Sequence, residues 1–150
     1  MEGGRAEDAR RVFQTVKQTR IIILVVLALA GGAVVWWFAI RPVRQRAKAR
    51  HDVNVLAFVL DKFVQEQGEY PQGDLGTICR LLKGESINGQ NPRRLDYVEA
   101  SAYEQNDKGE FVDPWRTPYR LSFNPVVRVY SCGPNRIDEQ GAGDDIASGN

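Results

Sequence analysis

The hydrophobic positions of the chain begin with one long apolar run. Residues 21–40 read IIILVVLALAGGAVVWWFAI, with no charged residue and no proline. Twenty residues in a helix rise about 30 Å, which matches the hydrocarbon thickness of a bilayer. Trp36 and Trp37 lie near one end, where indole rings favour the headgroup level, and an arginine closes each end. We therefore predict a transmembrane helix over residues 21–41. It is a lasting anchor, because its Trp-Trp-Phe end lacks the small residues of a cleaved secretory signal.

A second periodic segment follows the apolar run. Pro42 predicts a bend, because proline removes one helix hydrogen bond and crowds the carbonyl one turn before it. Apolar residues then recur with helical spacing over residues 53–67, and Asp52 is assigned to the polar remainder. Gly68 is expected to end this amphipathic helix. The apolar face needs a surface on which to pack.

The strand pattern comes late in the chain. A short helix is expected over residues 75–83, and a turn-rich segment follows it. Alternation over residues 119–123, a turn at Asn124-Pro125 and a return over residues 126–131 predict a β-hairpin. One amphipathic helix packed on a small antiparallel sheet makes an α+β domain.

Charge divides the chain near the same boundary. Residues 1–50 carry ten Lys and Arg against three Asp and Glu, and residues 51–150 carry ten against sixteen. The acidic half is a poor partner for nucleic acid, and the basic segment 41–50 is expected to meet lipid headgroups. We predict a basic tail over residues 1–20, followed by the span and by a soluble domain over residues 42–150. Because cations flank both ends of the span, charge alone does not set the topology.

The composition of the acidic half disfavours an enzyme. His51 is the single histidine, and it lies among basic residues beside the span, so a catalytic triad has one badly placed candidate base. GxxxxGK[ST], GxGxxG and HExxH are absent from the sequence. Cys79 and Cys132 do not form a CxxC motif, and either one disulfide or two buried thiols fits them.

The last segment carries a candidate metal site. Residues 131–146 contain four carboxylates, an asparagine and three glycines directly after a predicted strand. Glycines let a loop fold tightly, so that carboxylate and carbonyl oxygens converge as Ca²⁺ requires, although the spacing is not that of an EF-hand. Taken alone, such a tail is more often a solvated terminus than a metal site.

Three segments together resemble the major pseudopilins of bacterial type II secretion systems, members of the type IV pilin-like family. They are Ala47-Lys48 leading through the amphipathic helix to residues 67–71 (QGEYP), residues 111–119 (FVDPWRTPY), and Ser131-x-Gly133-Pro-Asn135 running to Gly143-Asp144-Asp145-Ile146. The resemblance implies a pilin-like fold in which the membrane helix continues into the domain, and a terminal loop that binds one structural calcium ion. It also implies a single-pass protein of the bacterial inner membrane, with a cytoplasmic N-terminus and a periplasmic domain. Its partners would be inner-membrane lipid and other pseudopilins or inner-membrane secretion components, and homo-oligomers are allowed.

The resemblance also implies the calcium ligands. The oxygen donors carried over are carbonyls around Ser131 and the side chains of Asn135, Asp138, Asp144 and Asp145. Asn135 stands where the family commonly has Asp. In the second segment Arg116 replaces the usual Gly, which puts the dihedral angles of that turn in question.

The start of the apolar run departs from the family. Members begin with a leader that ends in Gly and is cut by a prepilin peptidase, and the fifth residue of the processed chain is Glu. Aligning Pro42 with the family's proline places Ile21 at the processed end, so Arg20 stands for Gly and Val25 for Glu. That Glu is thought to offset a neighbour's N-terminal amine inside a low-dielectric bundle. We therefore expect an uncleaved protein, either a secretion-apparatus component or a stand-alone tethered domain that binds an envelope partner.

Overall fold

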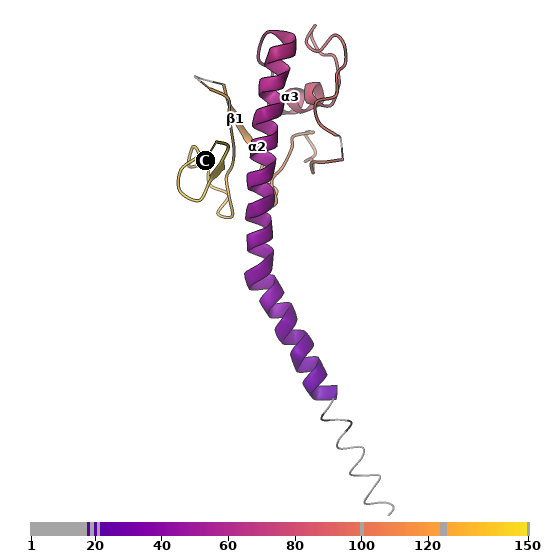
Figure 1. Ribbon diagram of the computed structural model, residues 1–150, viewed down its shortest axis with the longest axis vertical. Helices are drawn as coiled ribbons and strands as arrows, with labels where there is room; N and C mark the ends of the chain where they lie inside the picture. The colour runs from indigo at the N-terminus through magenta and orange to yellow at the C-terminus, as the bar shows by residue number, and fades with distance from the viewer. Residues whose placement is uncertain (1–17, 19, 21, 100, 124–125, 150) are drawn as a thin grey trace, which may run out of the picture. The chain divides into compact units, whose positions relative to one another are not determined.

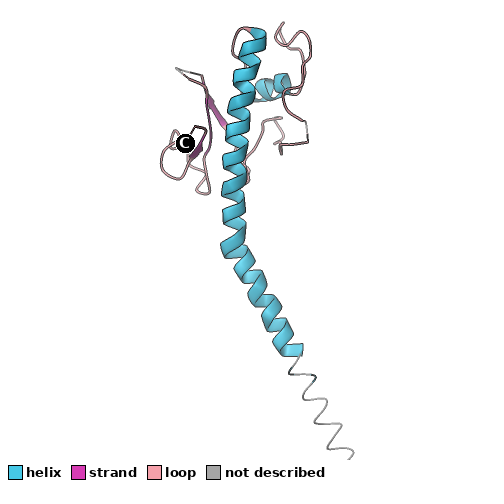
Figure 2. Cartoon of the chain, in the orientation of Figure 1, coloured by secondary structure: helices cyan, strands magenta, loops and turns pink. Residues whose placement is uncertain are grey.

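A computed structural model describes residues 18, 20, 22–99, 101–123 and 126–149 of the chain. The chain forms two compact units, Met1–Val43 and Arg44–Asn150. Most of the predicted basic tail and the predicted turn at residues 124–125 lie outside the described residues. Figure 1 gives the element labels, and Figure 2 distinguishes helices, strands and loops.

The first unit is helical through the apolar run. One helix, Ile22–Gln67, is long and apolar enough to cross a membrane, and its most apolar window has a mean hydropathy of 2.5 with no buried residue. Every residue from 22 to 40 is exposed. A helix in the core of a soluble protein would be covered by other elements, whereas an exposed apolar surface of this size calls for an apolar environment.

Helical hydrogen bonding changes type immediately before Pro42. Element η1, Trp36–Ile40, is a π-helix, in which the N–H of Arg41 donates to the carbonyl of Trp36. Proline has no N–H with which to continue this pattern, and a π turn is one way in which a helix accommodates such a residue. The guanidinium of Arg41 lies 4.2 Å from the ring centroid of Trp37. The predicted bend at Pro42 stays a prediction.

Helix α2, Arg41–Gln67, buries one face in the second unit. The predicted apolar stripe is confirmed, but it begins one turn earlier than expected. The buried residues are Ala49, Asp52, Val53, Leu56, Val59, Leu60 and Phe63. The predicted stop is also confirmed, because α2 ends one residue before Gly68, which has a φ of +87°.

The assignment of Asp52 to the polar face was wrong. Its side chain is buried, and one carboxylate oxygen accepts hydrogen bonds from Lys48 Nζ at 2.7 Å and from the hydroxyl of Tyr119 at 2.8 Å. A buried charge is tolerated when it is paired and hydrogen-bonded in this way. Burial and the charge of Asp52 raise the pKa of Tyr119, so that hydroxyl keeps its proton and remains the donor.

The predicted short helix is α3, Leu75–Leu82. Asp74 caps it by accepting a hydrogen bond from the N–H of Thr77 at 2.8 Å. Its apolar side packs into the same core as α2, and Cys79 on this side is a buried free thiol. Burial raises the pKa of Cys79 to about 11. Cys132 is also buried and free, so the alternative of two buried thiols holds in this structure.

Three short strands complete the second unit. Strands β1 (Arg120–Ser122), β2 (Arg128–Ser131) and β3 (Ile146–Ala147) form an antiparallel sheet in the order β1-β2-β3. The predicted hairpin is confirmed as the β1–β2 pair, with Leu121 opposite Val129. In Figures 1 and 2 the strands are drawn on one side of α2 and α3 on the other. The predicted α+β class is therefore confirmed.

Candidate metal-binding loop

The second motif segment folds around a buried aspartate. Asp113 is 1% exposed, and its Oδ1 accepts hydrogen bonds from the N–H groups of Trp115 and Thr117, both at 2.9 Å. Its Oδ2 accepts the hydroxyl of Ser131 at 2.5 Å. Three donors replace the water that this carboxylate loses on burial. We call residues 113–117 the Asp113 turn.

Ser131 connects this turn to the end of the chain. Its Oγ accepts a hydrogen bond from the N–H of Gly133 at 3.1 Å. Gly133 has a φ of +65°, and a Cβ at this position would collide with the carbonyl oxygen of Asp144. Only glycine meets both conditions without strain. The second and third motif segments, far apart in the sequence, are thus joined at one point.

Residues 133–145, which we call the acidic loop, bring three carboxylates together. Glu139, Asp144 and Asp145 each offer an oxygen, and these oxygens lie within 4.8 Å of one another. The loop backbone holds them in place. Asp145 Oδ2 accepts from the N–H groups of Glu139 at 3.1 Å and Gly141 at 2.7 Å, and Glu139 Oε2 accepts from the N–H of Asp144 at 2.9 Å.

The cluster has two unsatisfied oxygens. Asp144 Oδ1 and Asp145 Oδ1 are buried and make no hydrogen bond in the structure. Leaving such a group unpaired costs about 1–3 kcal/mol, and more when the group is charged. Three carboxylates so close together also repel one another. A hard divalent cation bound by these oxygens would relieve both costs, so the residues present fit calcium.

Asn135 lies at the rim of the cluster. Its N–H donates to Asp144 Oδ2 at 3.2 Å, and its Nδ2 donates to Glu139 Oε2 at 3.4 Å. Its side-chain oxygen accepts from the N–H of Ile137 at 2.7 Å. Of the five predicted ligand residues, the structure thus places Asp144 and Asp145 in the cluster and Asn135 beside it.

The side chains of Asp138 and Ser131 are directed to other partners. The carboxylate of Asp138 lies 3.2 Å from Nε of Arg120 and accepts the hydroxyl of Tyr130 at 3.0 Å. Burial, the hydrogen bond to Asp138 and the charge of that residue raise the pKa of Tyr130. The hydroxyl of Ser131 is bound to Asp113. The cluster therefore does not include these two side chains.

Comparisons with known proteins give one structural match. No protein-family model matches the chain, and no curated protein matches it. The crystal structure of the major pseudopilin from the type 2 secretion system of enterohaemorrhagic Escherichia coli is similar to this chain, with 20% sequence identity and a TM-score of 0.42. The match covers 69% of this chain and 85% of that chain. A likeness at this level assigns no role to any residue here.

Glu139 is the cluster member that sequence reasoning missed. The set implied by resemblance took its neighbour Asp138 instead. A local signal was present, because Gly141 and Gly143 follow Glu139 and both have positive φ, +81° and +55°. A Cβ on Gly143 would collide with the Glu139 carboxylate. Two glycines placed between an acid and an acidic pair thus let the chain turn back and bring the acids together.

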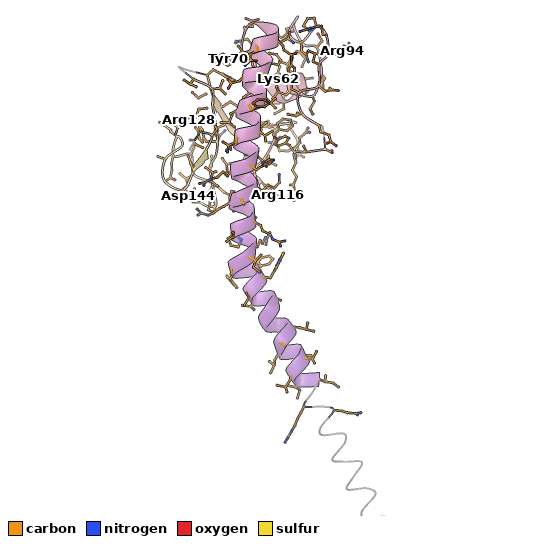
Figure 3. All side chains as sticks on the ribbon, viewed as in Figure 1. Lys62, Tyr70, Arg94, Arg116, Arg128 and Asp144 are labelled. Carbon is orange, nitrogen blue, oxygen red and sulfur yellow. The ribbon has the colours of Figure 1, made fainter. Side chains whose placement is uncertain are left out.

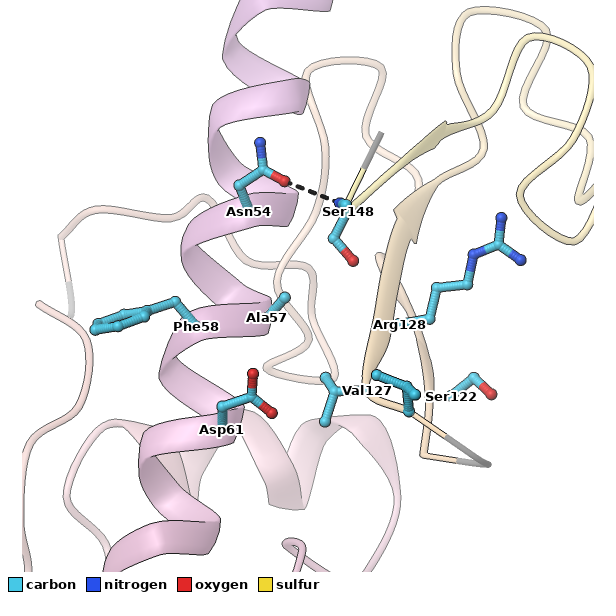
Figure 4. A pocket seen from close by; sticks show the side chains of 10 residues that line it. Asn54, Ala57, Phe58, Asp61, Ser122, Val127, Arg128 and Ser148 are labelled. Atoms are coloured by element: carbon cyan, nitrogen blue, oxygen red, sulfur yellow. Dashed lines mark hydrogen bonds between the residues drawn. The ribbon is translucent and has the colours of Figure 1, made fainter.

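A pocket elsewhere in the second unit is not lined by a carboxylate cluster like that of the acidic loop. It has a volume of about 690 Å³ and lies between α2 and the β1–β2 hairpin (Figure 4). Asp61 and Arg128 are its charged lining residues, and neither histidine nor cysteine lines it. The lining residue Asn54 accepts a hydrogen bond from the N–H of Gly149 at 3.4 Å. Ser122 and Ser148 supply its hydroxyl groups, and no cluster of titratable groups converges on them among the lining residues, so the acidic loop remains the stronger candidate site.

Proposed function

We propose that the protein is a membrane-anchored, pseudopilin-like structural component of a type II secretion or related apparatus, without enzymatic activity. The observation that carries this proposal is the contact between Asp113 and Ser131. It joins the two most specific segments of the family resemblance, the DPWRTPY block and the terminal Ser-x-Gly-Pro-Asn segment, through a buried hydrogen bond. A structural motif explains why these segments occur together in one chain.

The anchor is proposed to be the apolar part of the long helix. Residues 22–40 are all exposed, and the adjoining Arg41 is stacked on Trp37, an arrangement that suits a membrane interface. We place the N-terminus in the cytoplasm and the second unit in the periplasm of a bacterium, as the resemblance implies. In that arrangement the mechanism is mechanical, because the helix holds the folded unit at the membrane surface.

The acidic loop is proposed to bind one structural calcium ion. Glu139, Asp144 and Asp145 would supply carboxylate oxygens, and the two buried oxygens without donors support this assignment. Carbonyl groups near Asn135 and Ser131 would complete the shell of oxygens that calcium prefers. When bound, the ion supplies positive charge that offsets the repulsion of the three acids. Strand β3, only Ile146–Ala147, directly follows the loop, so a fixed loop also fixes the third strand.

Photo-crosslinking in the native membrane tests the structural role. A photoreactive residue replaces Leu29, whose side chain is 69% exposed on the helix. Because a pseudopilin-like span packs beside other such spans, we expect crosslinks to single-span proteins of the secretion apparatus or to a second copy. Asp107, exposed in the second unit, gives the control position. Crosslinks from position 29 to lipid alone would contradict the proposal.

Val25 favours a second candidate, a stand-alone tethered domain that binds an envelope partner. Its side chain is apolar and 51% exposed at the position where the resemblance expects Glu. Without that carboxylate, a processed N-terminal amine in the same bundle would lack its partner. The intact mass of the protein purified from its native membrane shows whether that amine is formed. A chain that starts at Ile21 favours an ordinary filament subunit, and a chain that keeps residues before Ile21 excludes that subunit and leaves an uncleaved apparatus component or the tethered domain.

A further inference from the structure

The start of α2 carries exposed arginines without ion-pair partners. Arg44, Arg46 and Arg50 are exposed, and within the described ranges none of them belongs to an ion pair shorter than 4.0 Å. No acidic residue occurs in residues 41–51. The next one, Asp52, is buried and is engaged by Lys48. These three cations are therefore available to an anion from outside the chain.

The fold brings a fourth arginine to the same end of the second unit. The carbonyl of Pro114 accepts a hydrogen bond from Nε2 of Gln45 at 3.2 Å, which docks the Asp113 turn near the start of α2. Arg116, two residues further along the turn, is exposed. Figure 3 shows Arg116 beside α2 at this end, whereas Lys62 and Arg94 lie at the opposite end of the unit.

The backbone of Arg116 is held in a conformation that arginine disfavours. Its φ is +67°, in the left-handed region, and its N–H donates to the carbonyl of Asp113 at 2.8 Å. A residue other than glycine costs free energy in this region. Five other non-glycine residues, Arg94 among them, also have positive φ, so this conformation alone assigns no use to Arg116. What distinguishes Arg116 is its position beside the start of α2, where its guanidinium is exposed.

Helix geometry places Arg44 at headgroup depth, and Arg46 and Arg50 close enough for their long side chains to reach that layer. This inference rests on the proposed membrane anchor, with the hydrocarbon layer ending near Ile40. At about 1.5 Å per residue, Arg44 and Arg46 lie roughly 5 Å and 8 Å along α2 from Arg41, and Gln45 carries the Asp113 turn at roughly 6 Å. The headgroup layer is about 5–7 Å thick on each side of a bilayer. Arg50, at roughly 14 Å, reaches the outer limit of this zone with its long side chain.

We propose that Arg44, Arg46, Arg50 and Arg116 form a basic collar that binds the phosphate groups of anionic lipids. Guanidinium groups bind phosphate oxygens through paired hydrogen bonds, and anionic leaflets attract basic segments next to a span. Arg116 has a particular effect, because its contact would link the membrane surface to the Asp113 turn. The collar thus sets the orientation of the folded unit on the bilayer as well as its distance from it.

Lipid selectivity measured by spin-label spectroscopy tests the collar. The full chain is reconstituted in vesicles of equal parts phosphatidylcholine and phosphatidylglycerol, and trace spin-labelled lipid of either kind reports its association with the protein. We expect phosphatidylglycerol to associate about twofold to fivefold more strongly than phosphatidylcholine, with a preference that falls as salt rises. Replacing Arg44, Arg46 and Arg50 by Gln should lower the ratio to the value that the cations of residues 1–20, on the other side of the span, support by themselves.

Arg116 has a matched control in Arg94. Both are exposed arginines with positive φ, +67° and +51°, but Arg94 lies at the far end of the unit. We expect R116Q and R116G to lower the lipid ratio, R116K to preserve it, and R94Q to leave it unchanged. R116G also relieves the backbone, so a lower ratio in that variant does not come from strain in the turn.

The outcomes separate the collar from the proposed anchor. Absence of any motionally restricted lipid would show that the chain does not span the bilayer, and the membrane part of the proposed function would fail. Restricted lipid with equal association of the two lipid types would overturn the collar alone. An equal loss of selectivity in R94Q and R116Q would show that net charge is responsible, which would overturn the role assigned to Arg116.

Discussion

The Asp113 turn and the acidic loop both contain aspartates that accept hydrogen bonds from backbone N–H groups. They differ in whether all the carboxylate oxygens have a donor. Asp113 is buried, and both of its oxygens are satisfied by protein donors. Asp144 and Asp145 each have one oxygen bound by backbone N–H groups and one that is buried without a donor. The turn is therefore complete without a ligand, whereas the loop has acceptor oxygens left for a cation.

The difference separates two kinds of aspartate that a sequence motif alone does not distinguish. Ser131 stands at the boundary, because its hydroxyl donates to Asp113 and accepts from the first glycine of the acidic loop. An aspartate with three donors stabilises the fold directly. A pair of aspartates with unpaired oxygens stabilises it only when positive charge is supplied. Calcium dependence is thus the property that should differ between the two regions.

Removal of the Asp113 carboxylate should have the largest effect. Asp113→Ala leaves the Ser131 hydroxyl and two N–H groups without their acceptor, so we expect the free energy of unfolding to fall by about 3–4 kcal/mol. The loss should be the same in calcium and in chelator, because no cation is involved. Thermal unfolding of the full chain in detergent micelles, followed by near-ultraviolet circular dichroism, measures it. Asp107→Ala, at an exposed position, should change stability little. A loss in Asp113→Ala that is seen only in calcium would contradict the conclusion that the Asp113 turn is complete without a ligand.

Loss of the acidic pair should come next and should depend on calcium. Replacing Asp144 and Asp145 by Asn keeps the side-chain acceptor oxygens but removes the charges. At calcium one hundred times its dissociation constant, binding stabilises a folded protein by about 2.7 kcal/mol. We expect the double variant to lose a stabilisation of about this size in calcium and to lose little in chelator. Equal losses in both conditions would mean that the carboxylates act without a cation.

Single substitutions of Asp138 and Glu139 test which of the two residues belongs to the ligand set. The expected changes in stability are smaller than those of the acidic pair. The carboxylate of Asp138 pairs with Arg120, and both partners are more than one third exposed, so solvent screening limits the pair to about 0.2–1 kcal/mol. Asp138→Asn should therefore lower stability by no more than this amount, equally in calcium and in chelator. Glu139→Gln should reduce only the calcium-dependent part. The reverse pattern would return Asp138 to the ligand set and remove Glu139.

The smallest expected effect is an increase in the free energy of unfolding when Arg116 is replaced by glycine. Glycine relieves the left-handed backbone by about 1 kcal/mol but loses about 0.5 kcal/mol through the greater freedom of the unfolded chain, so R116G should gain about 0.5 kcal/mol. Arg116→Ala keeps the strain and should show no such gain. The gain should be independent of calcium, because the Asp113 turn needs no ion. Chemical denaturation of the full chain in micelles resolves it, and a loss in R116G would show that the side chain stabilises the turn.

Local patterns account for most of the fold. The alternation before Asn124 predicted the β1–β2 hairpin, and Gly68 predicted the end of α2, because each signal lies within the element that it describes. Strand β3 was not predicted, since a two-residue strand has no periodicity and its pairing depends on the preceding loop. Asp52 was misassigned because a pattern counts a carboxylate as solvated. Its partner Tyr119 lies 67 residues away, and nothing in the local pattern indicates that contact.

The sequence predicted the location of the candidate site better than it predicted which residues form it. The density of acids and glycines placed it in residues 131–146, and the structure brings Asp144 and Asp145 together there. The choice between Asp138 and Glu139 depends on which neighbour faces the cluster. That choice is made by the left-handed glycines after Glu139 and by Arg120, which lies on β1 and draws Asp138 away. Such competition between partners becomes visible only once the chain is folded.

Isothermal titration of calcium into the full chain, held in detergent micelles and freed of bound ions beforehand, measures whether the acidic loop binds the ion. We predict one saturable site per chain, retained in Asp138→Asn and abolished when Asp144 and Asp145 are both replaced by Asn. The absence of saturable binding, or binding unchanged in the double variant, would contradict the assignment of the acidic loop as a cation site.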